Sequence, residues 1–253
     1  MKRRTVLVTG AAKRLGASIA RRLQADGHRP VIHYNGSGAE AAALAAELAA
    51  PMVQGDLSEL DGIDALFVRA RAAAGGPIDG LVNSASAFMF DRPPEVDPAL
   101  MTRLYAVNAA APVLLASALA RQDDVADGAV VDILDQKLAN PNPDFFSYSL
   151  TKAALASATV LMAQAFAPRV RVNAVSPGLT LPSGDQSAAE FAAVARANLL
   201  ERPVGADAVA AAVVYLLEAG SVTGQNLFVD AGQRFCRRDG DVMFEGRERP
   251  RHG

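Results

Sequence analysis

Short runs of apolar and β-branched residues recur along the chain, and the segments between them carry apolar residues at helical spacing. Leu15, Ile19 and Leu23, for example, would share one face of a helix. This alternation predicts a single-domain α/β fold of the Rossmann type, a doubly wound parallel sheet of about seven strands with helices on both faces. The expected strands are 5–9 (TVLVT), 30–34 (PVIHY), 51–54 (PMVQ), 78–83 (IDGLVN), 129–134 (AVVDIL), 170–175 (VRVNAV) and 225–229 (QNLFV).

The domain organisation is simple. No internal repeat and no linker rich in Pro, Gly and Ser divides the chain, so we expect one domain over residues 1–232. Within it, residues 177–205 place a short helical stretch between turns that contain proline and glycine, a pattern typical of a lid over a site. Residues 233–253 are highly charged and form a tail that is either disordered or packed on a neighbouring subunit.

The composition narrows the possible partners. The chain has 253 residues, 51% of them hydrophobic, and can bury a large core. Its net charge of -2 and pI near 5.9 provide no basic field for nucleic acid or an anionic membrane, so a small molecule is expected. Cys236 has no second cysteine to pair with, and the histidines show no metal-ligand spacing. We therefore interpret the histidines as structural and expect no metal; they are His28, His33 and His252.

The N-terminus is basic, but the apolar run that follows it at 5–9 is too short for a signal peptide. No apolar stretch approaches the ~18 to 20 residues that cross a bilayer. We expect no membrane association and a cytoplasmic location.

The first expected strand ends in TGAAKRLG at 9–16 and enters a helix. At this point a doubly wound sheet offers backbone N–H groups and a helix N-terminus to a pyrophosphate, and Gly10 and Gly16 would let the backbone approach closely. The spacing differs from the G-x-G-x-x-G fingerprint, and a glycine pair after a strand is by itself equally consistent with a plain turn. The place of the pair in the predicted fold favours a dinucleotide site.

The end of the second strand bears on the choice of cofactor. An NAD site places an Asp or Glu there, against the ribose hydroxyls, whereas this chain reads His-Tyr-Asn-Gly-Ser at 33–37. Without a carboxylate nothing repels a 2'-phosphate, Ser37 can donate to it, and Arg14 can supply a charge-assisted contact. The sequence therefore predicts NADPH. The alternative for Arg14 is a solvated surface arginine.

Two further loops fit the same cofactor. Asp56, followed by Leu57, can accept from the adenine amino group or cap a helix N-terminus. The segment Asn83-Ser84-Ala85-Ser86 offers small and polar residues where a cofactor would pass close to the backbone, although alone it would indicate only a loop.

A candidate catalytic pair lies in the helical segment SYSLTKAALASATVLMAQAF, where Tyr148 and Lys152 are four residues apart and share one face. A phenol has a pKa near 10, and a neighbouring ammonium stabilises its phenolate, which brings proton exchange nearer neutral pH. The same spacing arises often by chance, so in isolation the pair would be read as structural.

Taken together, the motifs resemble the short-chain dehydrogenase/reductase family, in order and over residues 5–232. They are TGAAKRLG, GDLSE, VNSAS, Asn108 in YAVNAAAP, YSLTK, VNAVSPG and VTGQNLFVDAG. The resemblance implies that Tyr148 donates a proton, that Lys152 binds the nicotinamide ribose, and that Asn108 holds a water of a proton relay. It also implies a homotetramer. The implied cofactor contacts are Gly10, Lys13, Arg14, Leu15, Gly16, Tyr34, Asn35, Ser37, Asp56, Leu57, Asn83, Ser84, Ala85, Tyr148, Lys152, Pro177 and Gly178.

Several positions resemble the pteridine and dihydromonapterin reductase branch of that family. The loop has Lys13-Arg14-Leu15 where a third glycine is usual, and Asp135 replaces the serine expected thirteen residues before the tyrosine. Ser86 replaces a common glycine, and Phe88 matches an aromatic that sandwiches the pterin ring against nicotinamide. The resemblance implies that a dihydropterin is reduced to the tetrahydro form, with a substrate site formed by Ser86, Phe88, Asp135 and Tyr148.

The chemistry of Asp135 agrees with this implication. A carboxylate beside Tyr148 opposes phenolate formation, keeps the tyrosine a protonated donor, and can resupply the proton. Alternatively, Asp135 pairs with Lys137 at a strand end, and Phe88 is a core residue. One departure concerns the cofactor: the branch commonly has an arginine where this chain has Gly36, so the 2'-phosphate would rest on Arg14 and Ser37.

Two other functions remain open. One is a reductase of the same fold that acts on a carbonyl, such as a 3-oxoacyl or sugar-alcohol substrate, which Asp135 argues against. The other is a catalytically silent sensor that binds NADPH and reports to a partner. The retained set Asn108, Tyr148 and Lys152 argues against a sensor.

Overall fold

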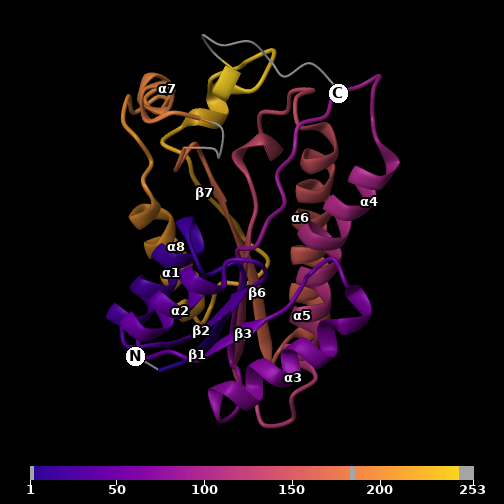
Figure 1. The fold of residues 1–253 in the computed structure, drawn as a ribbon, viewed down its shortest axis with the longest axis vertical. Coiled ribbons are helices and arrows are strands. Elements are labelled where there is room, and N and C mark those ends of the chain that lie inside the picture. The colour runs from indigo at the N-terminus through magenta and orange to yellow at the C-terminus, as the bar shows by residue number, and fades with distance from the viewer. Residues whose placement is uncertain (1–2, 183–185, 245–253) are drawn as a thin grey trace.

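The computed structural model describes residues 3–182 and 186–244, so residues 183–185 of the expected lid and 245–253 of the expected tail lie outside the described residues. The described chain forms a single seven-stranded parallel sheet in the order β3-β2-β1-β4-β5-β6-β7 (Figure 1), which confirms the predicted α/β fold. The strands are β1 (Thr5–Val8), β2 (Arg29–Tyr34), β3 (Met52–Gln54), β4 (Gly80–Asn83), β5 (Gly128–Ile133), β6 (Val170–Pro177) and β7 (Asn226–Val229).

Helices cover both faces of the sheet. Along β1 the side chains alternate, so that Val6 and Val8 pack into one core cluster and Leu7 into another. The first cluster includes residues of α1, α2 and α8, and the second includes residues of α3, α5 and α6. These two groups of helices lie on opposite sides of the sheet (Figure 1). The helices are α1 (Arg14–Ala25), α2 (Gly38–Glu47), α3 (Ile63–Ala74), α4 (Pro98–Tyr105), α5 (Ala111–Ala120), α6 (Phe146–Phe166), α7 (Ala188–Val194) and α8 (Ala206–Glu218).

The order of strands fixes where a ligand can bind. β1 lies between β2 and β4, so the connections from β1 and β4 leave in opposite directions and a crevice opens beyond their carboxyl ends. Gly10 follows β1 and Ala85 follows β4 in the loops at this crevice, and Thr9 Oγ1 joins the loops by accepting from the backbone N–H groups of Ser84 and Ala85 at 3.0 Å each.

One helical stretch differs from expectation. Pro98–Ala120 comprises α4, a π-helical turn at Ala106–Ala110 and α5, and by its 23 residues and composition it is long enough to cross a membrane. The sequence argument that no stretch approaches this length is wrong here, because it required an unbroken apolar run. In the fold the stretch acts as a core helix, since Leu104, Leu115 and Leu119 are fully buried against the rest of the chain.

The charged tail is also ordered as far as Phe244. Gln233–Phe235 and Val242–Phe244 each form a 3-10 turn, and the side chains of Val242, Met243 and Phe244 are buried in the chain's own fold. Over 233–244 the alternative of disorder is therefore wrong, whereas packing on a neighbouring subunit stays a prediction. Although the segment is charged overall, its three consecutive apolar residues are buried within the chain's own fold.

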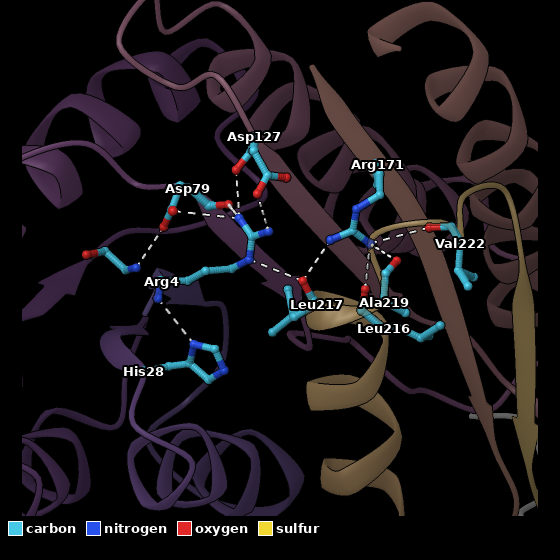
Figure 2. Close-up of polar contacts among 10 residues, drawn as sticks. Arg4, His28, Asp79, Asp127, Arg171, Leu216, Leu217, Ala219 and Val222 are labelled. Carbon is cyan, nitrogen blue, oxygen red and sulfur yellow. Dashed lines mark hydrogen bonds and ion pairs between the residues drawn. The ribbon is translucent and has the colours of Figure 1, made fainter. Parts of the chain in front are cut away.

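At the amino ends of the strands, the end of the sheet opposite the crevice, two arginines bind backbone carbonyls (Figure 2). Arg4, which is 4% exposed, donates to the oxygens of Leu217 and Asp127 at 3.1 and 2.7 Å and pairs with the Asp127 carboxylate at 2.9 Å. Arg171 donates to Leu217 and Ala219 at 2.7 and 2.9 Å. The Leu217 and Ala219 carbonyls lie at the C-terminal end of α8, where cations also oppose the negative end of the helix dipole.

We expect Arg4→Met to lower the free energy of unfolding by about 3 kcal/mol, because it removes a buried guanidinium that donates to Leu217 O and Asp127 O and pairs with the partly buried Asp79 carboxylate. Urea denaturation measures this. The matched control is Arg21→Met, whose ion pair with Glu47 is half exposed on both sides and should contribute under about 1 kcal/mol. Equal effects of the two substitutions would contradict the role given to Arg4.

Candidate active site

A cleft of about 710 Å³ lies at the carboxyl ends of the central strands. It brings together most of the residues that the sequence singled out, from the loops after β1, β2, β3, β4 and β6, from the turn after β5, and from α6. The predicted residues that line it are Gly10, Lys13, Arg14, Leu15, Gly16, Asn35, Asp56, Leu57, Ser84, Ala85, Ser86, Phe88, Asp135, Tyr148, Lys152, Pro177 and Gly178.

The other four predicted residues are not among those that line the cleft in the described structure: Tyr34, Ser37, Asn83 and Asn108. Tyr34 ends β2 and Ser37 precedes α2, at the rim. Asn83 is buried and donates to Asp132 Oδ1 at 2.8 Å. Asn108, fully buried in the π-helical turn, binds the loop after β4: its Oδ1 accepts from Ala87 N at 2.8 Å and its Nδ2 donates to Ala87 O at 2.9 Å. Its side chain therefore positions the loop.

The glycine loop after β1 is packed too tightly for side chains. A Cβ on Gly10, whose φ is +63°, would lie 2.9 Å from Ala85 Cα, and one on Gly16 would lie 2.3 Å from Gly10 O. His33 supports this loop from β2, because its Nδ1 accepts from Gly10 N at 3.2 Å while Nε2 faces Gly55 O at 3.1 Å. Burial lowers the pKa of His33 to about 4, so the ring is neutral and structural, as expected.

The start of α1 fits an anionic ligand. Within the described chain no side chain caps this N-terminus, and its first turn has no acidic residue. Arg14, Leu15 and Gly16 of the first turn line the cleft beside Gly10 and Lys13, and the first N–H groups of a helix, which have no partner within it, are groups that can bind a pyrophosphate. Tight glycine packing and an uncapped helix end are both features that a dinucleotide site requires, so the residues present fit a dinucleotide.

Arg14 lies in this loop but has an additional partner. Its Nη2 donates to Pro182 O at 2.6 Å, so the guanidinium spans from the glycine loop to the segment after β6. It is exposed and lines the cleft. Asp56 lines the cleft too, and its Oδ1 accepts from the N–H and hydroxyl of Ser58. The following 3-10 turn begins after Glu59, so Asp56 is no helix N-cap.

The central residue of the candidate site is Tyr148, which lies on α6 next to the turn that follows β5. Its hydroxyl donates to Oδ2 of Asp135 at 2.8 Å. Burial and the Asp135 carboxylate raise the pKa of Tyr148 well above its usual value, and burial raises the pKa of Asp135 as well. Both shifts favour the protonated forms, so the pair is built to hold a proton and not to form a free phenolate.

Lys152 follows one turn later on α6. Its Nζ donates to Ile133 O at 2.7 Å and lies 5.6 Å from the centre of the Tyr148 ring. Burial lowers the pKa of Lys152 to about 8, so its charge is lost as pH rises through that value. Asp132, fully buried behind it, accepts from Asn83 and Thr159 at 2.8 Å each, and burial raises its pKa to about 6.

The alternative in which Lys137 pairs with Asp135 is wrong. The Lys137 backbone N–H donates to Asp135 Oδ1 at 2.8 Å, but the ammonium turns away to Asp144 O and Asp241 Oδ2, at 2.6 and 3.2 Å. Asp135 thus keeps one oxygen on the backbone turn and the other on Tyr148. The Lys137 ammonium therefore pairs with Asp241 of the C-terminal segment and not with Asp135, its neighbour in sequence.

An aromatic residue forms the side of the cleft next to Tyr148. Phe88 is 41% exposed and lines the cleft, so it is not a core residue. It stacks on Phe145 with ring centres 4.0 Å apart and meets the edge of Tyr148 at 4.7 Å. One face of Phe88 is therefore occupied by Phe145. Ser86 is exposed in the same loop and donates to Asn108 Oδ1 at 3.3 Å.

The interpretation of the sequence did not identify several residues that line the cleft. Those in the turn after β5 and in the segment after β6 sit next to predicted residues, and proximity alone would have found them. Those in the C-terminal segment carried no signal except a cluster of apolar residues in a charged tail. The missed residues include Leu134, Gln136, Lys137, Leu179, Thr180, Leu181, Gln233, Asp241, Val242 and Met243.

Known proteins resemble this chain in sequence and in fold. A family model described as Enoyl-(Acyl carrier protein) reductase matches residues 10–234. The structure of FolM alternative dihydrofolate reductase 1 from Brucella suis in complex with NADP matches with a TM-score of 0.88 and 39% identity, covering 92% of this chain and 96% of that one.

Two curated relatives differ in the substrates that their names give. Pteridine reductase 1 of Leishmania tarentolae is 32% identical, over 91% of this chain and 96% of its own length. The 3beta-hydroxysteroid dehydrogenase 1 of Eggerthella lenta is 34% identical, over 92% and 94%. Similarity of this degree leaves the substrate to be argued from the site itself.

We expect Tyr148 to ionise at a lower pH in Asp135→Asn than in the wild type, because the substitution removes the negative charge that disfavours phenolate. The tyrosinate absorbance of each protein minus that of its Tyr148→Phe counterpart isolates this one phenol. Identical titrations in the two backgrounds would show that Asp135 does not control the proton on Tyr148.

Proposed function

Since this chain belongs to the short-chain dehydrogenase/reductase family and is an oxidoreductase, we propose that it reduces a dihydropterin to the tetrahydro form with NADPH. The observation that carries the proposal is the hydrogen bond of 2.8 Å between Tyr148 and the partly buried Asp135, which forms a proton-holding pair in place of the tyrosine and serine usual in the family.

The cofactor would lie along the cleft. Gly10, Gly16 and the N-terminus of α1 would hold its pyrophosphate, and Arg14 and Ser37 would meet the 2'-phosphate. Lys152 would bind the nicotinamide ribose, with Pro177 and Gly178 beside the nicotinamide. When bound, NADPH supplies the hydride.

The chain's own residues supply the proton. Reduction of a C=N bond adds a hydride to carbon and a proton to nitrogen, so a donor must lie near the ring nitrogen. Tyr148 is held protonated and donates its hydroxyl proton there, and Asp135, whose pKa is raised by burial, resupplies it. The Lys152 ammonium stabilises the phenolate during transfer and is protonated below about pH 8.

The substrate end of the cleft suits a flat ring with polar edges. Phe88 lines it, and polar atoms of Ser86, Asp135 and Tyr148 converge beside it. A carbonyl reductase would need a neutral donor fixed toward the carbonyl oxygen, whereas Asp135 is a carboxyl group already bonded to Tyr148. Carbonyl reduction is therefore the second candidate, kept open by the hydroxysteroid relative.

Three broader features belong to the same proposal: a cytoplasmic location, a homotetramer, and a lid formed by residues 177–205. The bond from Arg14 to Pro182 supports the lid, since it joins this segment to the cofactor loop. Light scattering of the purified protein tests the tetramer.

We expect NADPH to bind at least tenfold more tightly than NADH, a difference of about 1.4 kcal/mol, because no carboxylate follows β2 to repel the 2'-phosphate. Fluorescence titration of each cofactor measures this. Gly36→Asp, at a position with open space around it, should weaken NADPH and spare NADH. Equal affinities of the wild type for both cofactors would refute the preference.

We expect the protein to oxidise NADPH with at least one of dihydromonapterin, dihydrobiopterin and dihydrofolate. Tyr148→Phe should slow this about 100-fold and Asp135→Ser about tenfold or more, the range for losing a proton donor or a relay group, while NADPH affinity stays unchanged. If all three dihydropterins are untouched and a simple ketone is reduced, the function is carbonyl reduction. If no substrate is reduced, the remaining hypothesis is a catalytically silent sensor that binds NADPH.

A further inference from the structure

The C-terminal segment Gln233–Phe244 returns to the substrate end of the cleft, where it lies above the sheet at the top of Figure 1. Gln233, Asp241, Val242 and Met243 all line the cleft together with Asp135 and Tyr148. The segment therefore contributes to the same cavity as the proposed catalytic pair, although most of it lies beyond residues 10–234, the part that the family model matches.

Polar contacts attach this segment to the turn after β5. Asp241 Oδ2 pairs with Lys137 Nζ at 3.2 Å, and Asp241 N donates to Asp144 Oδ2 at 2.8 Å. Lys137 also donates to Asn142 Oδ1 at 3.0 Å. Lys137 and Asp241 are 5% and 13% exposed, so their ion pair is shielded from water.

Apolar contacts complete the attachment. Phe244 stacks parallel to Phe145 with ring centres 5.8 Å apart, and Phe145 in turn stacks on Phe88 at 4.0 Å. Met243, 4% exposed, joins the same cluster as Tyr148. The C-terminal segment thus supports, through one layer of aromatic rings, the phenylalanine that lines the substrate end.

We propose that the segment Gln233–Phe244 is a wall of the substrate site, in which Met243 sets the fit of the substrate ring and Asp241 is a positioning residue for the Tyr148–Asp135 pair. The proposal rests on the proposed function for the nature of the substrate. Its electrostatic part, however, concerns groups that are present whether or not a substrate is bound.

The charges around the pair explain the role of Asp241. Asp135 faces Lys137 from its own turn, Tyr148 and Lys152 from α6, and Asp241 from the C-terminal segment. The Asp241 carboxylate raises the pKa of both Asp135 and Tyr148, and it also offsets the charge of Lys137. Without it, Lys137 would favour loss of the proton that catalysis needs.

The first test is Asp241→Asn, with Asp239→Asn as the matched control, because Asp239 carries the same charge in the same segment but is exposed. Without the Asp241 charge, Asp135 and Tyr148 lose their protons at lower pH. The alkaline limb of the kcat profile should therefore move to lower pH in Asp241→Asn and stay in place in Asp239→Asn. Asp241→Glu, which keeps the charge, should restore the wild-type limb.

The tyrosinate titration provides a readout that needs no substrate. Tyr148 should ionise at a lower pH in Asp241→Asn than in the wild type, even if no dihydropterin is reduced and the proposed function fails. Superimposable titrations and superimposable pH profiles would overturn the role of Asp241. If Asp241→Asn does not fold, the same measurements on Lys137→Met, which leaves the Asp241 charge uncompensated, should move in the opposite direction; no movement there also overturns the role.

The second test is Met243→Ala, with Met89→Ala as the control, because Met89 is exposed on the loop that carries Phe88. Met243→Ala should raise the KM of the reduced substrate about fivefold, or about 1 kcal/mol, and leave the Kd of NADPH unchanged. Met89→Ala should change neither. An unchanged KM in Met243→Ala, for a dihydropterin or for a ketone if that is what the protein reduces, would show that the segment is no wall of the site.

Discussion

The hydrogen bond between Tyr148 and Asp135 places a phenol against a partly buried carboxyl group in the cleft, and the surrounding structure is arranged to support it. A buried carboxylate is costly unless its oxygens are bonded. One Asp135 oxygen accepts from the backbone of Lys137 and the other from Tyr148. The Lys152 ammonium is near enough to balance the charge, while its bond to Ile133 O fixes its place at the end of β5. The pair therefore exists only because the strand, the turn and α6 meet at one point.

A further set of buried contacts holds the loops of the cleft in place. Asn108 fixes the loop after β4, Thr9 joins that loop to the end of β1, and His33 supports the glycine loop. All three side chains are nearly or fully buried and use backbone groups as partners. Rigid support of this kind keeps polar groups in position before a ligand arrives, which lowers the cost of binding.

The two ends of the parallel strands differ in what they do. At the amino ends, Arg4 and Arg171 bind the carbonyls that end α8 and tie this helix to the strands (Figure 2). At the carboxyl ends, the uncapped start of α1 and the polar side chains around Tyr148 face an open cleft. The contacts at the amino ends serve stability, whereas the helix N-terminus and the side chains that line the cleft are the groups a ligand can use.

Local patterns in the sequence determined the strands, helices α1 and α6, the glycine loop and the Tyr148–Lys152 pair, because each depends on residues within a few turns of one another. Tertiary structure alone decided the partner of Lys137, the place of the C-terminal segment and the burial of the Pro98–Ala120 stretch. Lys137 illustrates the reason. Its neighbour in sequence is Asp135, but its ammonium meets Asp241, 104 residues away, once the segment's apolar side chains have packed beside Phe145. No periodicity or spacing encodes a contact between groups that only the folded core brings together.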